Sequence, residues 1–157
     1  MSTVHTDVVR TGAMREPVHT VSASAPWPAG GLGDAGGHVE LESWSTIGGG
    51  YAVLVAAGAL DIAVRDELTA ALTDAAERTE STLIVDLSRV TVLAAAGFHC
   101  LEGVADLLSQ RGAVLYLVCA QGRPARRILA ILDDRHRWPL YSDVPAAIQS
   151  VPGAARR

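Results

Sequence analysis

The chain has 157 residues, a formal net charge of −4 at pH 7, and 49% hydrophobic residues, while aromatic residues make up only 4%. This length suits one ordinary domain with an extension, whose core must be built from aliphatic side chains. No basic run is present that would neutralise a row of phosphates, and no apolar run approaches the roughly 20 residues of a membrane span. We therefore expect neither nucleic-acid nor membrane partners.

The first segment, residues 1–37, is expected to be a mobile N-terminal tail. It contains "ASAPWPAGGLGDAGG", is rich in Gly, Ala, Pro and Ser, and shows no helical or strand period. Such a segment buries too little apolar surface to offset the entropy lost on ordering. Trp27 is the one tail residue with enough apolar surface to dock on a domain. The domain is expected to begin near His38.

Two strands and a helix are predicted next. "HVELESW" alternates apolar and polar residues, which is typical of a half-exposed strand. The glycines at 48–50 predict a turn into the buried strand "YAVLVAAG". Asp61 is placed to cap the following helix. The apolar residues of this helix recur at helical spacing: Val64, Leu68, Leu72 and Ala75.

Further strands and helices alternate along the rest of the chain. "STLIVDL" is a continuous apolar run, as expected of a central strand covered on both faces. A second helix follows Gly97 and stops at Gly112, and "AVLYLVC" is the next buried strand. Pro124 opens a third helix, the run "DDRHRW" is interpreted as a solvated loop, and "WPLY" as a short strand. Ser142 or Asp143 caps the last helix.

This order of elements predicts an α/β fold. We expect a mixed β-sheet of about five strands with about four α-helices packed on it, preceded by the mobile tail. Residues 38–152 would form the domain and residues 153–157 a short C-terminal tail. A homodimer through the exposed edge of the first strand remains open.

From about Tyr51 to Val151 the sequence resembles a STAS domain. "LVAAGALDIAVRDELTAAL" is similar to the family's first junction, where a strand ends in Gly, an acidic or small residue, Leu or Ile, and Asp before a helix. "LIVDLSRVTVLAAAGFHCLEG" carries the Asp-Leu-Ser strand end and the turn before the second helix. The best-known members are anti-sigma factor antagonists. The resemblance implies a non-enzymatic regulator of transcription that binds a kinase-like anti-sigma factor and frees its sigma factor.

The family's regulatory turn is altered in this chain. In the antagonists it reads Asp-Ser-Ser-Gly, and phosphorylation of the first serine is the switch. Aligned on the Asp-Leu-Ser strand end, this turn falls on Ala94-Ala95-Ala96-Gly97, so Ala95 occupies the phospho-acceptor position. A helix N-terminus holds a phosphate well, but alanine has no hydroxyl to carry one. Gly97 is expected to keep a structural role by permitting close approach of another backbone.

The resemblance places the interaction surface around this turn, and several alternatives stay open. The expected residues are Asp61, Ala94, Ala95, Ala96, Gly97, Phe98 and His99. Asp61 also fits a helix N-cap, and Phe98 also fits a core position. The chain is interpreted as an antagonist that phosphorylation at this turn cannot release, or as a degenerate scaffold with another protein partner. The alternative from another class is a small-ligand or nucleotide-sensing module.

No catalytic or metal site is predicted. His99 and Cys100 are neighbours and diverge by about 100° on a helix, and the five histidines lack metal-ligand spacing. No cofactor is expected. Cys100 and Cys119 are interpreted as small core residues, with a disulfide or a reactive thiol as the alternatives. With no signal peptide evident, the expected location is the cytoplasm.

Overall fold

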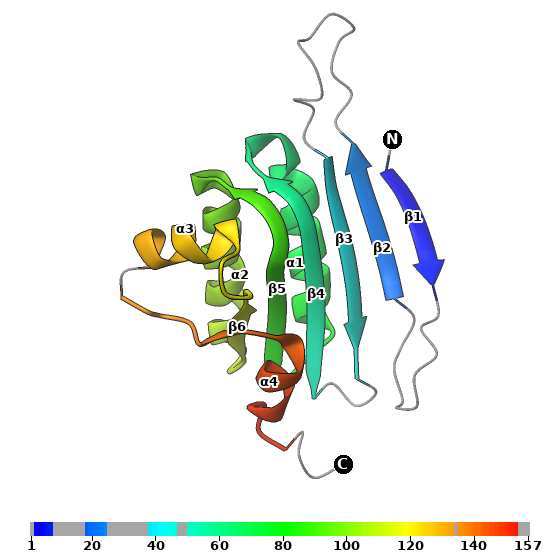
Figure 1. The fold of residues 1–157 in the computed structure, drawn as a ribbon. Coiled ribbons are helices and arrows are strands. Elements are labelled where there is room, and N and C mark those ends of the chain that lie inside the picture. Colours follow the sequence, from blue (N-terminus) through cyan, green and yellow to red (C-terminus); the bar gives the residue numbers. More distant parts are fainter. Residues whose placement is uncertain (1, 8–17, 25–37, 47–49, 134, 154–157) are drawn as a thin grey trace, which may run out of the picture.

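A single sheet organises the chain in the computed structural model, which describes residues 2–7, 18–24, 38–46, 50–133 and 135–153 (Figure 1). Its strands are β1 (Ser2–Asp7), β2 (Val18–Ser24), β3 (His38–Ser45), β4 (Tyr51–Leu60), β5 (Thr82–Leu93), β6 (Val114–Val118) and β7 (Leu140–Tyr141). The helices are the 3₁₀ turn η1 (Ile62–Val64), α1 (Arg65–Glu77), α2 (Ala95–Gln110), α3 (Pro124–Leu132) and α4 (Val144–Gln149).

The sheet is mixed, with its strands in sequence order. Strands β1 to β4 pair antiparallel, and β4 to β7 pair parallel. Parallel neighbours require long crossovers, and α1, α2 and α3 supply them. From β3 onward, the predicted mixed sheet of five strands with four α-helices is confirmed. So are the short strand at Leu140–Tyr141 and the cap at Asp143, whose carboxylate accepts a hydrogen bond from the Ala146 N–H at 2.8 Å.

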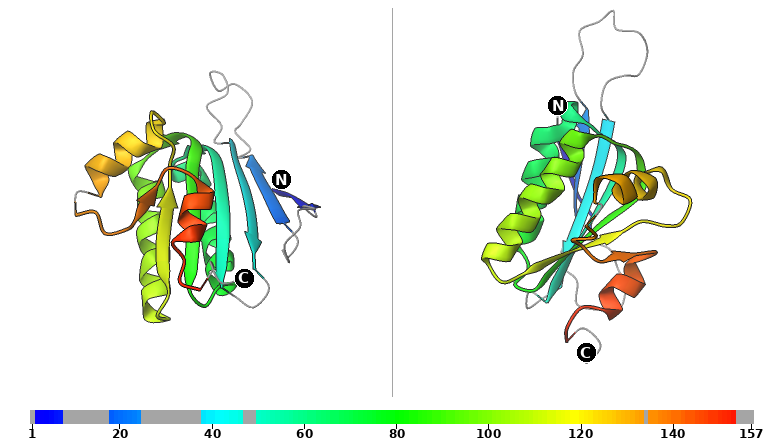
Figure 2. Two further views of the ribbon diagram at one scale, coloured as in Figure 1. Left: turned by 60° about the horizontal axis from the view of Figure 1, so that its bottom comes forward. Right: turned by 90° about the vertical axis from the view of Figure 1, so that its left-hand side faces the viewer.

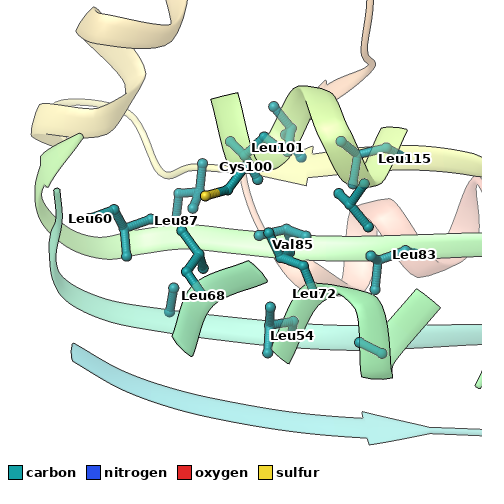
Figure 3. Packing of buried hydrophobic residues seen from close by; sticks show 14 of the residues in the cluster. Leu54, Leu60, Leu68, Leu72, Leu83, Val85, Leu87, Cys100, Leu101 and Leu115 are labelled. Carbon is teal, nitrogen blue, oxygen red and sulfur yellow. The ribbon is translucent and has the colours of Figure 1, made fainter. Parts of the chain in front are cut away.

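Helices cover both faces of the central strands. Figure 2 shows α1 and α2 side by side on one face and α4 on the opposite face. Successive side chains of a strand point to opposite faces, so Leu54 and Val85 join the larger core while Val53 and Ile84 join the smaller one beneath α4. The larger core is aliphatic, as the composition predicted (Figure 3).

Two strands lie in the segment that the sequence assigned to a tail without strands. β1 and β2 pair with each other, and β2 pairs with β3 from His19↔Ser43 to Ser24↔His38. The physical reason is the open edge of β3, which offers unpaired backbone groups to a segment rich in β-branched residues. Trp27 lies outside the described residues.

One half of β5 extends past its neighbour on the β6 side. The last pair with β6 is Asp86↔Val118, whereas pairing with β4 continues to Leu60↔Leu93. α3 packs against this overhanging half of β5. The carboxyl ends of β4 and β5 therefore lie side by side, next to the start of α2.

Candidate functional site

The 94–97 turn is tied to the end of β4. The Ala94 N–H donates a hydrogen bond to the Leu60 carbonyl oxygen at 3.0 Å. Ala94 has an extended backbone, with φ −84° and ψ 167°, and α2 begins at the next residue. The backbone of the turn is thus held by main-chain contacts, whatever side chains it carries.

Ala95, which the resemblance aligns with the phospho-acceptor of the antagonists, is the first residue of α2 and is exposed. The N-cap residue Ala94 makes no side-chain hydrogen bond, and the first turn of α2 contains no acidic residue. The first N–H groups of a helix lack intrahelical partners, so this end of α2 has the electrostatic character that favours a phosphate. The side chain of Ala95 at this position is a methyl group, which has no hydroxyl.

Gly97 is required by close packing, as the sequence predicted. A Cβ on Gly97 would lie 2.6 Å from the Leu60 carbonyl oxygen and 2.8 Å from the Leu60 Cβ. No side chain fits at these distances, because real Cβ atoms essentially never approach other atoms this closely. The start of α2 therefore rests directly on the end of β4.

Asp61 follows this contact and acts as an N-cap. Its carboxylate accepts a hydrogen bond from the Ala63 N–H at 3.0 Å, so Asp61 is an N-cap, but of the 3₁₀ turn η1 and not of α1 as the sequence predicted. α1 begins at Arg65, and its own N-cap, Val64, makes no side-chain hydrogen bond. The cap presents the next residue, Ile62, to solvent with 75% of its surface exposed. Nothing in the sequence pattern singled out Ile62, because its exposure depends on the 3₁₀ turn that precedes α1.

Phe98 belongs to the core, since only 5% of its surface is exposed. Its ring lies 5.4 Å from that of Trp138, centroid to centroid, and the Arg137 guanidinium lies 5.7 Å from the Phe98 ring centroid. The "DDRHRW" run is therefore not simply a solvated loop. Asp133 in that run is buried and accepts a hydrogen bond from the Arg137 N–H. A tryptophan within a charged run was the available signal for this packing.

His99 is an exposed member of the expected surface, like Ala95, and it pairs with Glu102 one turn later. The His99 side chain is 73% exposed, and its Nδ1 lies 2.8 Å from the Glu102 Oε1. The hydrogen bond from His99 is the main cause that lowers the pKa of Glu102, and Arg137 contributes at 3.0 Å. Glu102 thus joins the start of α2 to the loop that follows α3.

A groove between α1 and α2 opens beside the turn, with a volume of about 650 Å³. The residues that line it are Ile62, Arg65, Thr69, Leu72, Thr73, Ala96, His99, Cys100, Gly103, Val104 and Leu107. The structure therefore brings Ile62, Ala96 and His99 to one surface, from segments that are distant in the sequence. Of the other expected residues, Phe98 and Gly97 face inward.

Both cysteines are free and buried, so the interpretation as core residues is confirmed over the disulfide. Cys100 Sγ lies 3.4 Å from the Thr69 Oγ1 between α1 and α2, and Cys119 Sγ lies 3.9 Å from the Leu87 carbonyl oxygen. Burial is the main cause that raises the pKa of the Cys119 thiol. A raised pKa leaves little thiolate at neutral pH, which lowers the reactivity of the thiol.

We expect thiol reagents to modify the native protein slowly, with Cys119 slower than Cys100. Cys119 has no exposed surface, whereas Cys100 borders the α1–α2 groove. The measurement is a thiol titration with and without denaturant, with Cys100→Ala and Cys119→Ala to assign each rate. Both thiols should react after unfolding without any reductant. Thiols that appear only after reduction would contradict the free state of the cysteines.

The described part of the chain offers neither a metal cluster nor a membrane-spanning helix. Within it, no group of three or more His, Cys, Asp or Glu side chains is arranged to hold a metal ion. No described helix has both the length and the apolar character needed to cross a membrane.

Comparison with known proteins identifies the family. The family model of the STAS domain matches residues 45–147. An anti-sigma factor antagonist from Mycobacterium paratuberculosis superposes with a TM-score of 0.62 at 20% identity, covering 72% of this chain and 93% of that one. The anti-sigma factor antagonist SpoIIAA, in its unphosphorylated form, gives 0.54 at 17% identity, covering 73% and 98%.

A sulfate transporter family protein from Wolinella succinogenes shares the same fold, with a TM-score of 0.53 at 21% identity over 72% of this chain and 93% of that one. Anti-sigma factor antagonists and a protein of a transporter family thus share this fold. No curated protein matches the sequence. Since the family model covers well over half of the residues, the chain belongs to the STAS domain family.

Proposed function

We propose that this chain is an anti-sigma factor antagonist that is not switched by phosphorylation at the 94–97 turn. It would bind a kinase-like anti-sigma factor, and the released sigma factor would change transcription. The observation that carries the proposal is the turn itself. Gly97 makes the close approach to another backbone that its glycine allows, here at Leu60, while Ala95 presents only a methyl group.

The exposed groups around the turn suit a protein partner. Ile62 offers a large apolar side chain at the rim of the α1–α2 groove, and Ala96 and His99 border the same groove. Burial of such apolar surface drives association, and a polar rim gives it orientation. A phosphate at position 95 would add about two negative charges to this surface, and that change is not available here.

A small-ligand module is the less favoured alternative. A ligand site usually has a few polar groups that converge on the bound molecule. In the α1–α2 groove, two of the four polar side chains named above are already engaged: Thr69 bonds to Cys100, and His99 pairs with Glu102. We also propose a non-enzymatic, cytoplasmic role, in keeping with two cysteines that remain free.

Binding measurements test the proposal. The full chain is mixed with each kinase-like anti-sigma factor of the same organism, with ADP and with ATP, and the affinity is measured by calorimetry. We expect tight binding to one of them that survives long incubation with ATP. Ile62→Glu should weaken that binding by about tenfold or more, because a charge would then face the apolar contact.

Val114→Glu is the matched control, because Val114 is also an exposed aliphatic residue but pairs with Thr82, at the opposite end of β5 from the turn. It should leave the affinity unchanged. If no anti-sigma factor binds, the STAS scaffold serves another partner. If both variants lose affinity equally, the anti-sigma factor does not bind specifically at Ile62.

A further inference from the structure

A second groove lies between the overhanging half of β5 and α3. Its volume is about 760 Å³, and it shares no lining residue with the α1–α2 groove. It exists because β6 ends opposite Asp86, so that α3 instead of a strand packs beside the end of β5. Its apolar part includes Val92, Leu93, Pro124 and Ile128, and half of the Val92 surface is exposed.

Three arginines line the same groove, and none of the described residues that line it is acidic. Arg126 has a structural role, since its guanidinium donates a hydrogen bond to the Cys119 carbonyl oxygen at 2.6 Å. Arg123 and Arg127 are exposed, and neither has an ion-pair partner among the described residues. In a chain with a net charge of −4, this groove is a local region of positive charge.

We propose that the β5–α3 groove binds an acidic peptide segment, carrying apolar side chains as well, from a partner protein. The planar guanidinium group suits carboxylates, which it binds through paired hydrogen bonds. Val92 and Ile128 would receive the apolar side chains of the same segment. A nucleotide fits less well, because the described residues of the groove include no aromatic ring to stack on a base.

This surface goes beyond the contact proposed around the 94–97 turn. The two grooves are lined by different residues, so each can fail its test without the other. A chain with both surfaces would hold two segments at once, one at the turn and one beside α3. Linked contacts of this kind raise the overall affinity without any change in the individual sites.

The test uses the full chain and a fluorescent synthetic peptide of glutamates and leucines, followed by anisotropy. One control peptide has glutamine for glutamate, and the other has serine for leucine. We expect saturable binding of the first peptide only, weakened as salt is raised. The double variant Arg123→Gln/Arg127→Gln should lower the affinity by about tenfold or more. Val92→Ser should lower it less, without a change in salt dependence.

The matched control is Arg111→Gln/Arg135→Gln, which removes two exposed arginines that line neither this groove nor the α1–α2 groove and should bind as the wild type does. The proposal is overturned if the peptide does not saturate, if the glutamine peptide binds equally, or if the control variant loses as much affinity. Binding of ATP or of phosphatidylserine vesicles, but not of the peptide, through Arg123 and Arg127 would also overturn it, in favour of a nucleotide or a membrane surface.

Discussion

Replacing Gly97 with alanine is expected to lower the free energy of unfolding by about 1–3 kcal/mol, since overpacking of a close-packed site typically costs this much. The added Cβ would meet the Leu60 carbonyl oxygen at 2.6 Å and its carbonyl carbon at 3.2 Å. These are backbone atoms of a fully buried residue whose carbonyl also accepts the Ala94 N–H, so they have little freedom to move. Chemical denaturation of the variant measures the loss.

Gly103→Ala is the matched control, because Gly103 lies on the same helix and a Cβ there would meet nothing within 4 Å. Alanine is a better helix former than glycine, so this variant should gain roughly 0.5–1 kcal/mol. The two substitutions are chemically identical and are expected to have opposite signs. Equal effects would mean that the contact between α2 and β4 is looser than described.

On the proposed function, rebuilding the family turn should create a phosphorylation site. In the triple variant Ala94→Asp/Ala95→Ser/Ala96→Ser, the serine introduced at position 95 would stand at the exposed first position of α2. We expect the cognate kinase-like anti-sigma factor to modify this variant with ATP and to leave the natural chain unmodified. Phosphorylation should then weaken binding by about tenfold or more, since about two negative charges enter the contact.

Mass spectrometry reports the phosphate, and calorimetry compares the affinity before and after its addition. The control is Ala94→Asp/Ala96→Ser, which keeps Ala95 and should stay unmodified. Phosphorylation of this control or of the natural chain would show that another residue is the acceptor. If no variant is modified and none binds, the antagonist proposal loses its main support.

Local sequence signals were sufficient for most of the elements. Gly112 and Pro124 mark helix boundaries through their own backbone preferences, and both boundaries are confirmed. Gly97 was predicted because a glycine before a helix, aligned with the family turn, indicates a close approach. The identity of its neighbour, Leu60, was not available, since that contact depends on how β4 and β5 end together.

Contacts between distant segments were beyond local signals. Phe98 fitted the surface and the core equally, and its burial in the core, with Trp138 beside its ring, shows only in the folded chain. The strands in residues 2–7 and 18–24 were overlooked because the Gly- and Pro-rich stretch after them dominated the composition. Both grooves depend on side chains from more than one element, so neither could be predicted from one stretch of sequence.

The pairing of β2 with β3 changes how two copies of this chain would meet. Without it, β3 would present a free row of backbone groups, and a second copy could add its own strand there. Here the same chain occupies that position from His19 to Ser24. Association through strand pairing would therefore move out to β1, or would require β2 to leave its place and be exchanged between copies. β2 thus competes with the strand of a second copy for the same backbone groups of β3.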